Sequence, residues 1–179
     1  MRKLQPRLFL ALAAVMTAQP AFGLSCMAPD LIHTLNEAKA SETVYNIFVG
    51  RFDAPPAKAA PFANNRLPFG LQSQHQRPPE IVQSHFTGYA LAQSSRDDSP
   101  VTRLPVNIEI SCAASWCGHA PAPEADVIAF VEAGEDGHVL RASPCPGLVY
   151  PAAEPRIKTL RECLGKDCEP GKGLGMFAE

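Results

Sequence analysis

The stretch VNIEISC, residues 106–112, decides how this chain folds. Its apolar residues Val106, Ile108, Ile110 and Cys112 alternate with Asn, Glu and Ser. Successive side chains of a β-strand point to opposite faces of the sheet, so this alternation predicts a strand with one buried face and one wet face. The stretch therefore places the chain among proteins with a half-buried β-sheet.

Outward from this stretch, the chain contains several other runs that are rich in β-branched, aromatic and other apolar residues and are bounded by turn residues. The five strands that we predict cover residues 43–52, 81–92, 101–112, 126–132 and 139–143. The turn-rich segment 94–100 joins the second to the third, and Gly134-Glu135-Asp136-Gly137 forms a short hairpin loop between the last two. Gly50, inside the first strand, indicates a bulge or a sharp bend. Five strands in this order predict a mainly β fold, a barrel or a sandwich.

One helix is expected before the strands in the sequence and one after them. The first covers residues 29–39, where Leu31 and Leu35 share one face, and the second covers residues 155–164, with Gly165 just past its end. Each begins with a proline, which suits the first helical turn.

The first 23 residues have the features of a secretory signal peptide. Basic residues precede a short apolar run at 8–16, and small residues lead up to Gly23. The run is shorter than the roughly 20 apolar residues that span a membrane. We expect residues 1–23 to be removed and the chain to be exported, to the periplasm or the cell exterior. A lipoprotein anchored at Cys26 is disfavoured, because the residues before this cysteine fit a lipidation signal poorly.

The remaining residues, 24–179, are expected to form a single domain with no membrane span. Without Arg2, Lys3 and Arg7 the chain keeps 13 basic residues against 18 acidic ones, a net charge of −5. Phosphate binding needs concentrated Lys and Arg, so nucleic acid is not expected as a partner. The proline-rich segment 54–79 lacks periodicity and is predicted to be a long surface loop, either a tolerated insertion or a functional loop.

All six cysteines lie beyond the signal peptide. They are Cys26, Cys112, Cys117, Cys145, Cys163 and Cys168. An even number in an exported chain predicts three disulfides, whereas zinc sites usually show C-x2-C pairs. The pair Cys163 and Cys168 straddles a helix end and can meet, while the other four cysteines allow three pairings.

The sequence Trp116-Cys117-Gly118 is similar to the start of a thioredoxin-type motif, but the second cysteine of that motif is missing. Cys112 and Cys117 could still form a redox pair, so a thiol–disulfide protein is one alternative function.

Other chemistry-bearing patterns are absent from the sequence. The five histidines are scattered, with no H-x-x-x-H and no carboxylate at ligand spacing, and neither a G-x-S-x-G elbow nor a phosphate loop is present. We therefore expect no catalytic residue, no metal ligand and no cofactor, and we predict a non-enzymatic protein whose partner is an unidentified protein or small molecule.

The order of motifs resembles the N-terminal domain of tissue inhibitors of metalloproteinases and the related netrin-like modules. The likeness covers about residues 26–146: a cysteine soon after the signal peptide, a helix, a strand with Val49-Gly50, Trp116-Cys117-Gly118, a strand from Ala125, the acidic glycine turn and Cys145. The resemblance implies a five-stranded oligonucleotide/oligosaccharide-binding (OB) barrel with helices beside it, fastened by disulfides. It also implies a Cys26–Cys117 bridge, which leaves Cys112 for Cys145; pairing Cys26 with Cys112 and Cys117 with Cys145 stays open.

The same resemblance implies where a partner would bind. The inhibitors chelate a protease's zinc through the α-amine and carbonyl of their N-terminal cysteine, which here corresponds to Cys26, followed by Met27. This chain departs from that pattern, because Cys26-Met27-Ala28 replaces C-x-C and cleavage after Gly23 leaves two residues ahead of Cys26. We therefore predict a non-catalytic TIMP/netrin-like binding module, with a metalloprotease inhibitor as the second alternative.

Overall fold

The computed structural model describes Cys26 and residues 28–54, 79–113, 116–135 and 137–171. The expected signal peptide 1–23, Met27 and the loop 54–79 apart from its two end residues lie outside the described residues. No helix in the described part is long and apolar enough to cross a membrane.

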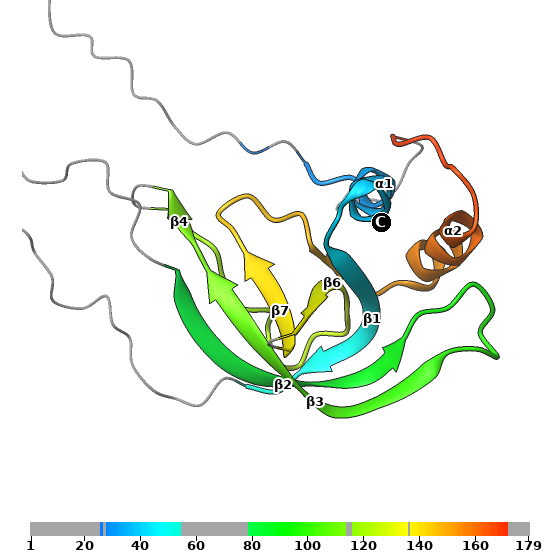
Figure 1. The fold of residues 1–179 in the computed structure, drawn as a ribbon. Coiled ribbons are helices and arrows are strands. Elements are labelled where there is room, and N and C mark those ends of the chain that lie inside the picture. The colour runs from blue at the N-terminus through cyan, green and yellow to red at the C-terminus, as the bar shows by residue number, and fades with distance from the viewer. Residues whose placement is uncertain (1–25, 27, 55–78, 114–115, 136, 172–179) are drawn as a thin grey trace, which may run out of the picture.

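Five strands close into a barrel (Figure 1). They are β1 (Val44–Phe52), β2 (Glu80–Ala90), β3 (Ser99–Ile110), β6 (Val127–Gly134) and β7 (Gly137–Ala142). The order around the barrel is β1-β2-β3-β7-β6, and β6 pairs again with β1. All neighbours are antiparallel except β3 and β7, which run parallel. The predicted mainly β, OB-like barrel is confirmed, and the strands do not follow one another as a simple meander because β3 lies beside β7 rather than β6.

Three short strands escaped the sequence analysis: β4 (Cys112–Ala113), β5 (Trp116–Cys117) and β8 (Val149–Pro151). β8 pairs with the part of β6 that β7 does not reach. The predicted strand 101–112 is too long at its end, because β3 stops at Ile110 and the backbone N–H of Ser111 turns to the carbonyl oxygen of Ala142, 2.9 Å away. Strands of two or three residues leave no periodicity to detect.

Both predicted helices are present, α1 (Leu31–Ala40) and α2 (Glu154–Leu164), and they lie together on one side of the barrel (Figure 1). α1 begins two residues later than predicted, because the Asp30 side chain accepts hydrogen bonds from the backbone N–H groups of Ile32 and His33. This cap satisfies donors that otherwise have no partner in the first turn.

The buried residues form two hydrophobic layers that share β6. One fills the barrel, around Phe52 and Phe86, and the other lies between the barrel wall and the two helices, around Leu35 and Leu160. Side chains of β6 alternate between the two, with Ala129 and Val131 inside the barrel and Ile128 and Phe130 under the helices. β6 is therefore apolar on both faces, as is expected of a strand covered on both sides.

The backbones of β1 and β2 come unusually close where Gly50 faces Gly88. A Cβ atom on Gly50 would lie 2.2 Å from the carbonyl oxygen of Thr87, and one on Gly88 would lie 2.2 Å from the carbonyl oxygen of Val49. β1 pairs with β6 up to Gly50 and with β2 from Phe48 onward, so this crossing is where it changes partners. The pairing of β1 runs through Gly50 without a shift in register, and the irregularity lies in β2, between Phe86 and Gly88.

α2 is fastened to the β2–β3 hairpin by an ion pair. The Arg161 guanidinium donates to both carboxylate oxygens of Asp98, at 2.7 and 2.5 Å, and to the carbonyl oxygen of Ala92. Both charged side chains are mostly buried, 17% exposed for Arg161 and 15% for Asp98. The hydrogen bond from Arg161 lowers the pKa of Asp98.

Substitution of Gly88 by alanine should destabilise the barrel by about 1–3 kcal/mol, because the new methyl group meets backbone atoms that cannot rotate away. Gly134→Ala is the matched control, since it adds a methyl group in another strand with no atom within 4 Å. Urea unfolding monitored by circular dichroism measures both. Equal stability of the two variants would contradict the steric account.

The Asp98→Asn variant should lose about 1–3 kcal/mol near neutral pH, the usual contribution of hydrogen bonds between charged groups. Because the folded pKa of Asp98 lies below its ordinary value of 3.8, the contribution is complete above that pH and is lost as the pH falls through the lowered pKa. The stability difference from the unaltered protein should therefore shrink in acid. Asp97→Asn, at the exposed neighbouring position, should change stability by less than about 0.5 kcal/mol.

Candidate binding surface

The structure joins all six cysteines in three disulfides: Cys26–Cys145, Cys112–Cys117 and Cys163–Cys168. The predicted use of the cysteines as cross-links is confirmed, and so is the pair at the end of α2. The Cys26–Cys117 and Cys112–Cys145 pairing that the resemblance implies is wrong, and so is its alternative. The reason is local: Cys112 and Cys117 face one another directly across β4 and β5.

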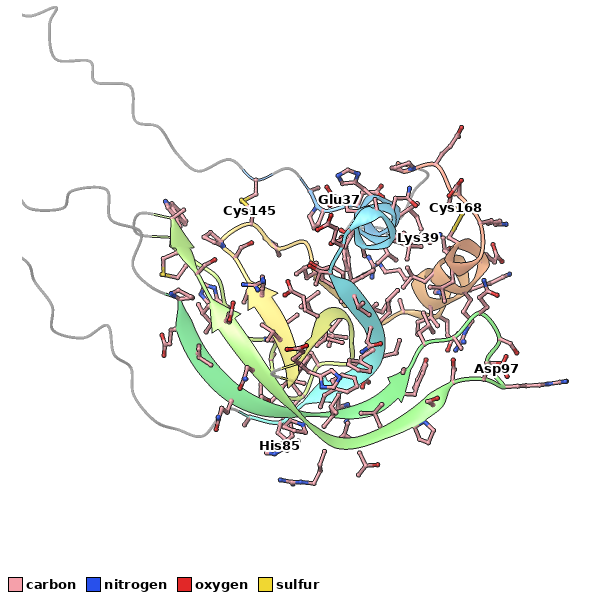
Figure 2. All side chains as sticks on the ribbon, viewed as in Figure 1. Glu37, Lys39, His85, Asp97, Cys145 and Cys168 are labelled. Carbon is pink, nitrogen blue, oxygen red and sulfur yellow. A yellow bond between two sulfur atoms is a disulfide. The ribbon has the colours of Figure 1, made fainter. Side chains whose placement is uncertain are left out.

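Parallel pairing of β3 and β7 brings two segments together at one end of the barrel. β3 ends at Ile110 beside Ala142, the last residue of β7. The β4–β5 hairpin follows β3, and the loop 143–147, which contains Cys145, follows β7. Figure 2 shows Cys145 on this loop, far from Cys168, which lies beside α2. We call this region, made of Cys26, residues 112–113 and 116–119 and the loop 143–147, the cystine end.

The base of the hairpin is anchored to the barrel through Gly118. Its backbone N–H donates to the carbonyl oxygen of Ser111, whose own N–H donates to Ala142. A Cβ atom on Gly118 would lie 2.1 Å from the carbonyl oxygen of Ala142, so only glycine fits this contact without movement. The glycine of the Trp-Cys-Gly motif thus allows the base of the hairpin to pack closely against β7.

Three large apolar side chains are the most exposed among the described residues, and two of them lie at or near the cystine end. Trp116, on β5 of the hairpin, is 58% exposed, and Ile81, near the start of β2, is 60% exposed. The third, Val44, is 63% exposed and pairs with Ala133 beside the β6–β7 turn, at the opposite end of β7. Exposed aromatic residues are enriched at protein interfaces.

An open cavity of about 330 Å³ lies within the cystine end. His119, directly after the hairpin, lines it together with Arg141, Ser143, Pro144 and Leu148. Its volume is near the lower end of the range of ligand sites.

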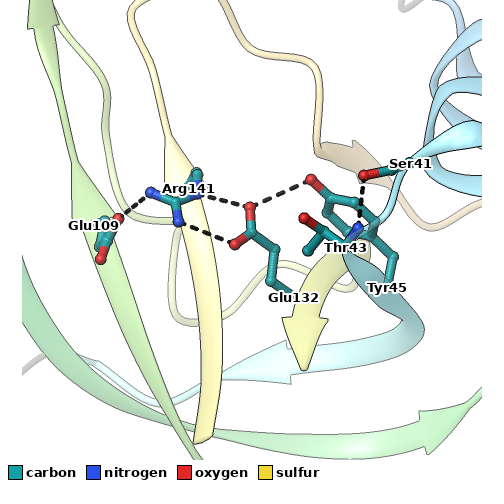
Figure 3. A network of polar contacts seen from close by, with 6 residues as sticks. All are labelled: Ser41, Thr43, Tyr45, Glu109, Glu132 and Arg141. Atoms are coloured by element: carbon teal, nitrogen blue, oxygen red, sulfur yellow. Dashed lines mark hydrogen bonds and ion pairs between the residues drawn. The ribbon is translucent and has the colours of Figure 1, made fainter. Parts of the chain in front are cut away.

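Arg141 is held in place by a polar network that crosses four strands (Figure 3). Its guanidinium donates to both carboxylate oxygens of Glu132, at 2.7 and 3.0 Å, and to Glu109, at 2.5 Å. The Tyr45 hydroxyl also donates to Glu132, at 3.2 Å. The hydrogen bond from Arg141 to Glu132 raises the pKa of the guanidinium, and burial raises the pKa of Tyr45. With both carboxylates on one cation, the network fixes β7 against β3 and β6 and contributes no free positive charge to the cavity.

A second, larger concavity of about 490 Å³ lies between the glycine crossing and α2. Gly50, Gly88, Tyr89 and Ile157 contribute to its apolar walls. On the rim, the Arg51 guanidinium donates to both carboxylate oxygens of Asp126, at 2.6 and 2.9 Å. Glu154 and Ile157 of α2 line this groove, and none of the described residues of the cystine end does.

The histidines stay apart in the structure, as far as they are described. His119 lines the cavity, His138 packs beside Phe48, and His85 lies 4.0 Å from an Asp53 oxygen. His33 contacts Glu37 at 3.2 Å across one turn of α1, an i, i+4 carboxylate pairing that the sequence analysis overlooked. No group of three or more His, Cys, Asp or Glu residues within the described ranges is arranged to hold a metal ion.

Of the two residues singled out for partner binding, Cys26 is exposed and bonded to Cys145, and Met27 lies outside the described residues. Sequence reasoning missed the cavity and the Arg141 network. Glu109, Arg141 and Glu132 are the outward-facing residues of their strands, so alternation could have placed each on the surface. Glu132 and Arg141 lie on the two strands of one hairpin, and only the strand order brings Glu109 to them.

No protein-family model matches the chain, and neither a curated protein nor a solved structure matches it significantly.

Removing disulfides one at a time should separate their contributions to stability by loop length. Cys26 and Cys145 are 119 residues apart, whereas Cys112 and Cys117 are five apart. In the chain-entropy account, serine at both positions should lower the free energy of unfolding by about 5 kcal/mol for the first pair and about 2 kcal/mol for the second. Urea unfolding of the two double variants tests this, with the Cys163→Ser/Cys168→Ser variant as a second short-loop control.

Proposed function

We propose that this chain is an exported, non-catalytic binding module that docks a protein partner at its cystine end. The observation that carries the proposal is the exposed Trp116 on a hairpin closed by its own disulfide. Ordering a flexible loop on binding costs free energy, and a covalently closed hairpin has less conformational freedom to lose. A large aromatic side chain presented in this way is typical of the residues that dominate binding energy at interfaces.

The surroundings of Trp116 support the same function. Gly118 locks the hairpin base against β7, and Cys145 ties the loop beside it to Cys26. Three segments distant in sequence are thus held as one rigid surface. The cavity beside His119 adds a recess in which a partner side chain could insert.

The resemblance to inhibitor and netrin-like modules points in the same direction, because such modules act by binding. Cys26, the residue matched to the inhibitors' zinc-chelating cysteine, belongs to the proposed surface. The proposal does not depend on chelation, which requires the α-amine of Cys26 to be free.

Substitution of Trp116 by alanine should weaken partner binding by about 2 kcal/mol, or roughly thirtyfold in Kd, as for a central interface residue. The partner is captured from the exported proteins of the producing cell with the mature chain, and its Kd is then measured with purified proteins. Val44→Ala removes an equally exposed side chain at the far end of the barrel and should leave the Kd unchanged.

Two results would overturn the proposal. One is an unaltered Kd for the Trp116→Ala variant with a reduced affinity for Val44→Ala. The other is catalytic turnover of a substrate by the purified chain, because a non-catalytic module has no such activity.

A further inference from the structure

We propose that the Cys112–Cys117 disulfide is a thiol–disulfide exchange site, which an external dithiol reduces while the barrel stays folded. This inference concerns the chemistry of the hairpin and does not depend on the proposed partner. It rests on how the three disulfides differ in exposure, in loop length and in attachment to the rest of the fold.

The Cys163–Cys168 disulfide is the closest comparison, because both pairs are five residues apart. Cys163 is 4% exposed and belongs to the hydrophobic layer under the helices. The segment around this bond is also held by α1: Lys39 donates to the carbonyl oxygen of Cys163 and Asn36 to that of Cys168. Exchange requires a thiolate to reach a sulfur atom. Burial obstructs the approach to Cys163, and Cys168, although only half-buried, packs against the same hydrophobic layer.

The Cys26–Cys145 disulfide is accessible at Cys26 but closes a far longer segment, 119 residues. Native structure that holds such distant residues together favours the closed bond strongly, so its reduction opposes the fold. Of the three disulfides, only Cys112–Cys117 combines a short loop with two cysteines that belong to neither hydrophobic layer.

The hairpin can open without loss of the barrel. β4 and β5 form a separate two-stranded sheet with two residues in each strand, and neither belongs to the six-stranded sheet. Both cysteines are half-buried, and their strand neighbours Ala113 and Trp116 are exposed. The hydrogen bonds of Ser111 and Gly118 anchor the hairpin base and involve neither cysteine.

The exchange balances as two substitutions at sulfur. A thiolate of the dithiol attacks Sγ of one cysteine, the Cys112–Cys117 bond breaks, and the other cysteine leaves as a thiolate that takes up a proton. The second thiol of the reagent then attacks the mixed disulfide and releases the remaining cysteine, which is protonated in turn. The protein gains two electrons and two protons, and the dithiol is oxidised to its disulfide.

Trp116 reports this reaction directly. It is the only tryptophan of the chain and is adjacent to Cys117. Opening the bond frees β5 from β4, so the tryptophan emission should change while the circular dichroism of the barrel does not.

The experiment treats the folded mature protein with dithiothreitol for increasing times, alkylates the free thiols and locates them by mass spectrometry. Cys112 and Cys117 should become labelled together, at least about tenfold faster than the other four cysteines, and in step with the change in fluorescence. A reduced peptide with two cysteines should then give one mole of peptide disulfide for each mole of hairpin reduced. Prior or simultaneous opening of either other disulfide would overturn the inference, as would labelling that follows unfolding.

Two variants identify the responding bond. Cys163→Ser/Cys168→Ser keeps the hairpin and should retain the fluorescence response, whereas Cys112→Ser/Cys117→Ser should lose it. Trp116→Phe should abolish the optical signal and leave the order of labelling unchanged. If the Trp116→Phe variant no longer shows Cys112 and Cys117 labelled first, exchange at the hairpin is refuted. This test remains decisive where a double cysteine variant fails to fold.

Discussion

β3 and β7 run side by side in the same direction over residues 106–110 and 138–142, and both leave the barrel at the same end. Parallel neighbours cannot be joined by a tight turn, so the chain must travel through the β4–β5 hairpin and β6 before it returns as β7. This detour provides β6, which closes the barrel on β1. It also places the segment after β3 against the segment after β7, which creates the cystine end.

Closure further depends on β1 changing partners. A strand of nine residues pairs with β6 in its first part and with β2 in its last, which forces the β1 and β2 backbones together at Gly50 and Gly88. The same crossing opens a groove toward α2. The barrel is small and is covered by helices on one side. Its closure therefore requires backbone contact at the crossing, and its cover requires apolar side chains on both faces of β6.

The charged residues fasten this frame at its periphery. Arg141 joins β3, β7 and β6 through Glu109 and Glu132, and Arg161 joins α2 to the β2–β3 hairpin through Asp98. Glu132 lies only nine residues from Arg141, across the β6–β7 hairpin. Glu109 and Asp98 lie 32 and 63 residues from their arginines, so these two contacts could not be assigned before the strand order was known. The disulfides act in the same manner at the cystine end, where the protein exposes its only tryptophan.

The sequence by itself determined the five long strands, both helices and the connection between β6 and β7. Alternation, capping and turn preferences are properties of neighbouring residues, so they can be detected locally. It also predicted that all six cysteines would pair, because an even number of cysteines in a chain that is expected to be exported favours disulfides. Only the tertiary structure decided that Cys26 bonds Cys145, that Cys112 bonds Cys117, and that a cavity forms beside them. The Cys112–Cys117 bond follows from the direct pairing of β4 with β5, a hairpin whose two-residue strands are too short to show a sequence pattern. The position of Cys145 and of the cavity depends on the parallel register of β3 and β7, a contact between residues some 32 positions apart that no local pattern encodes.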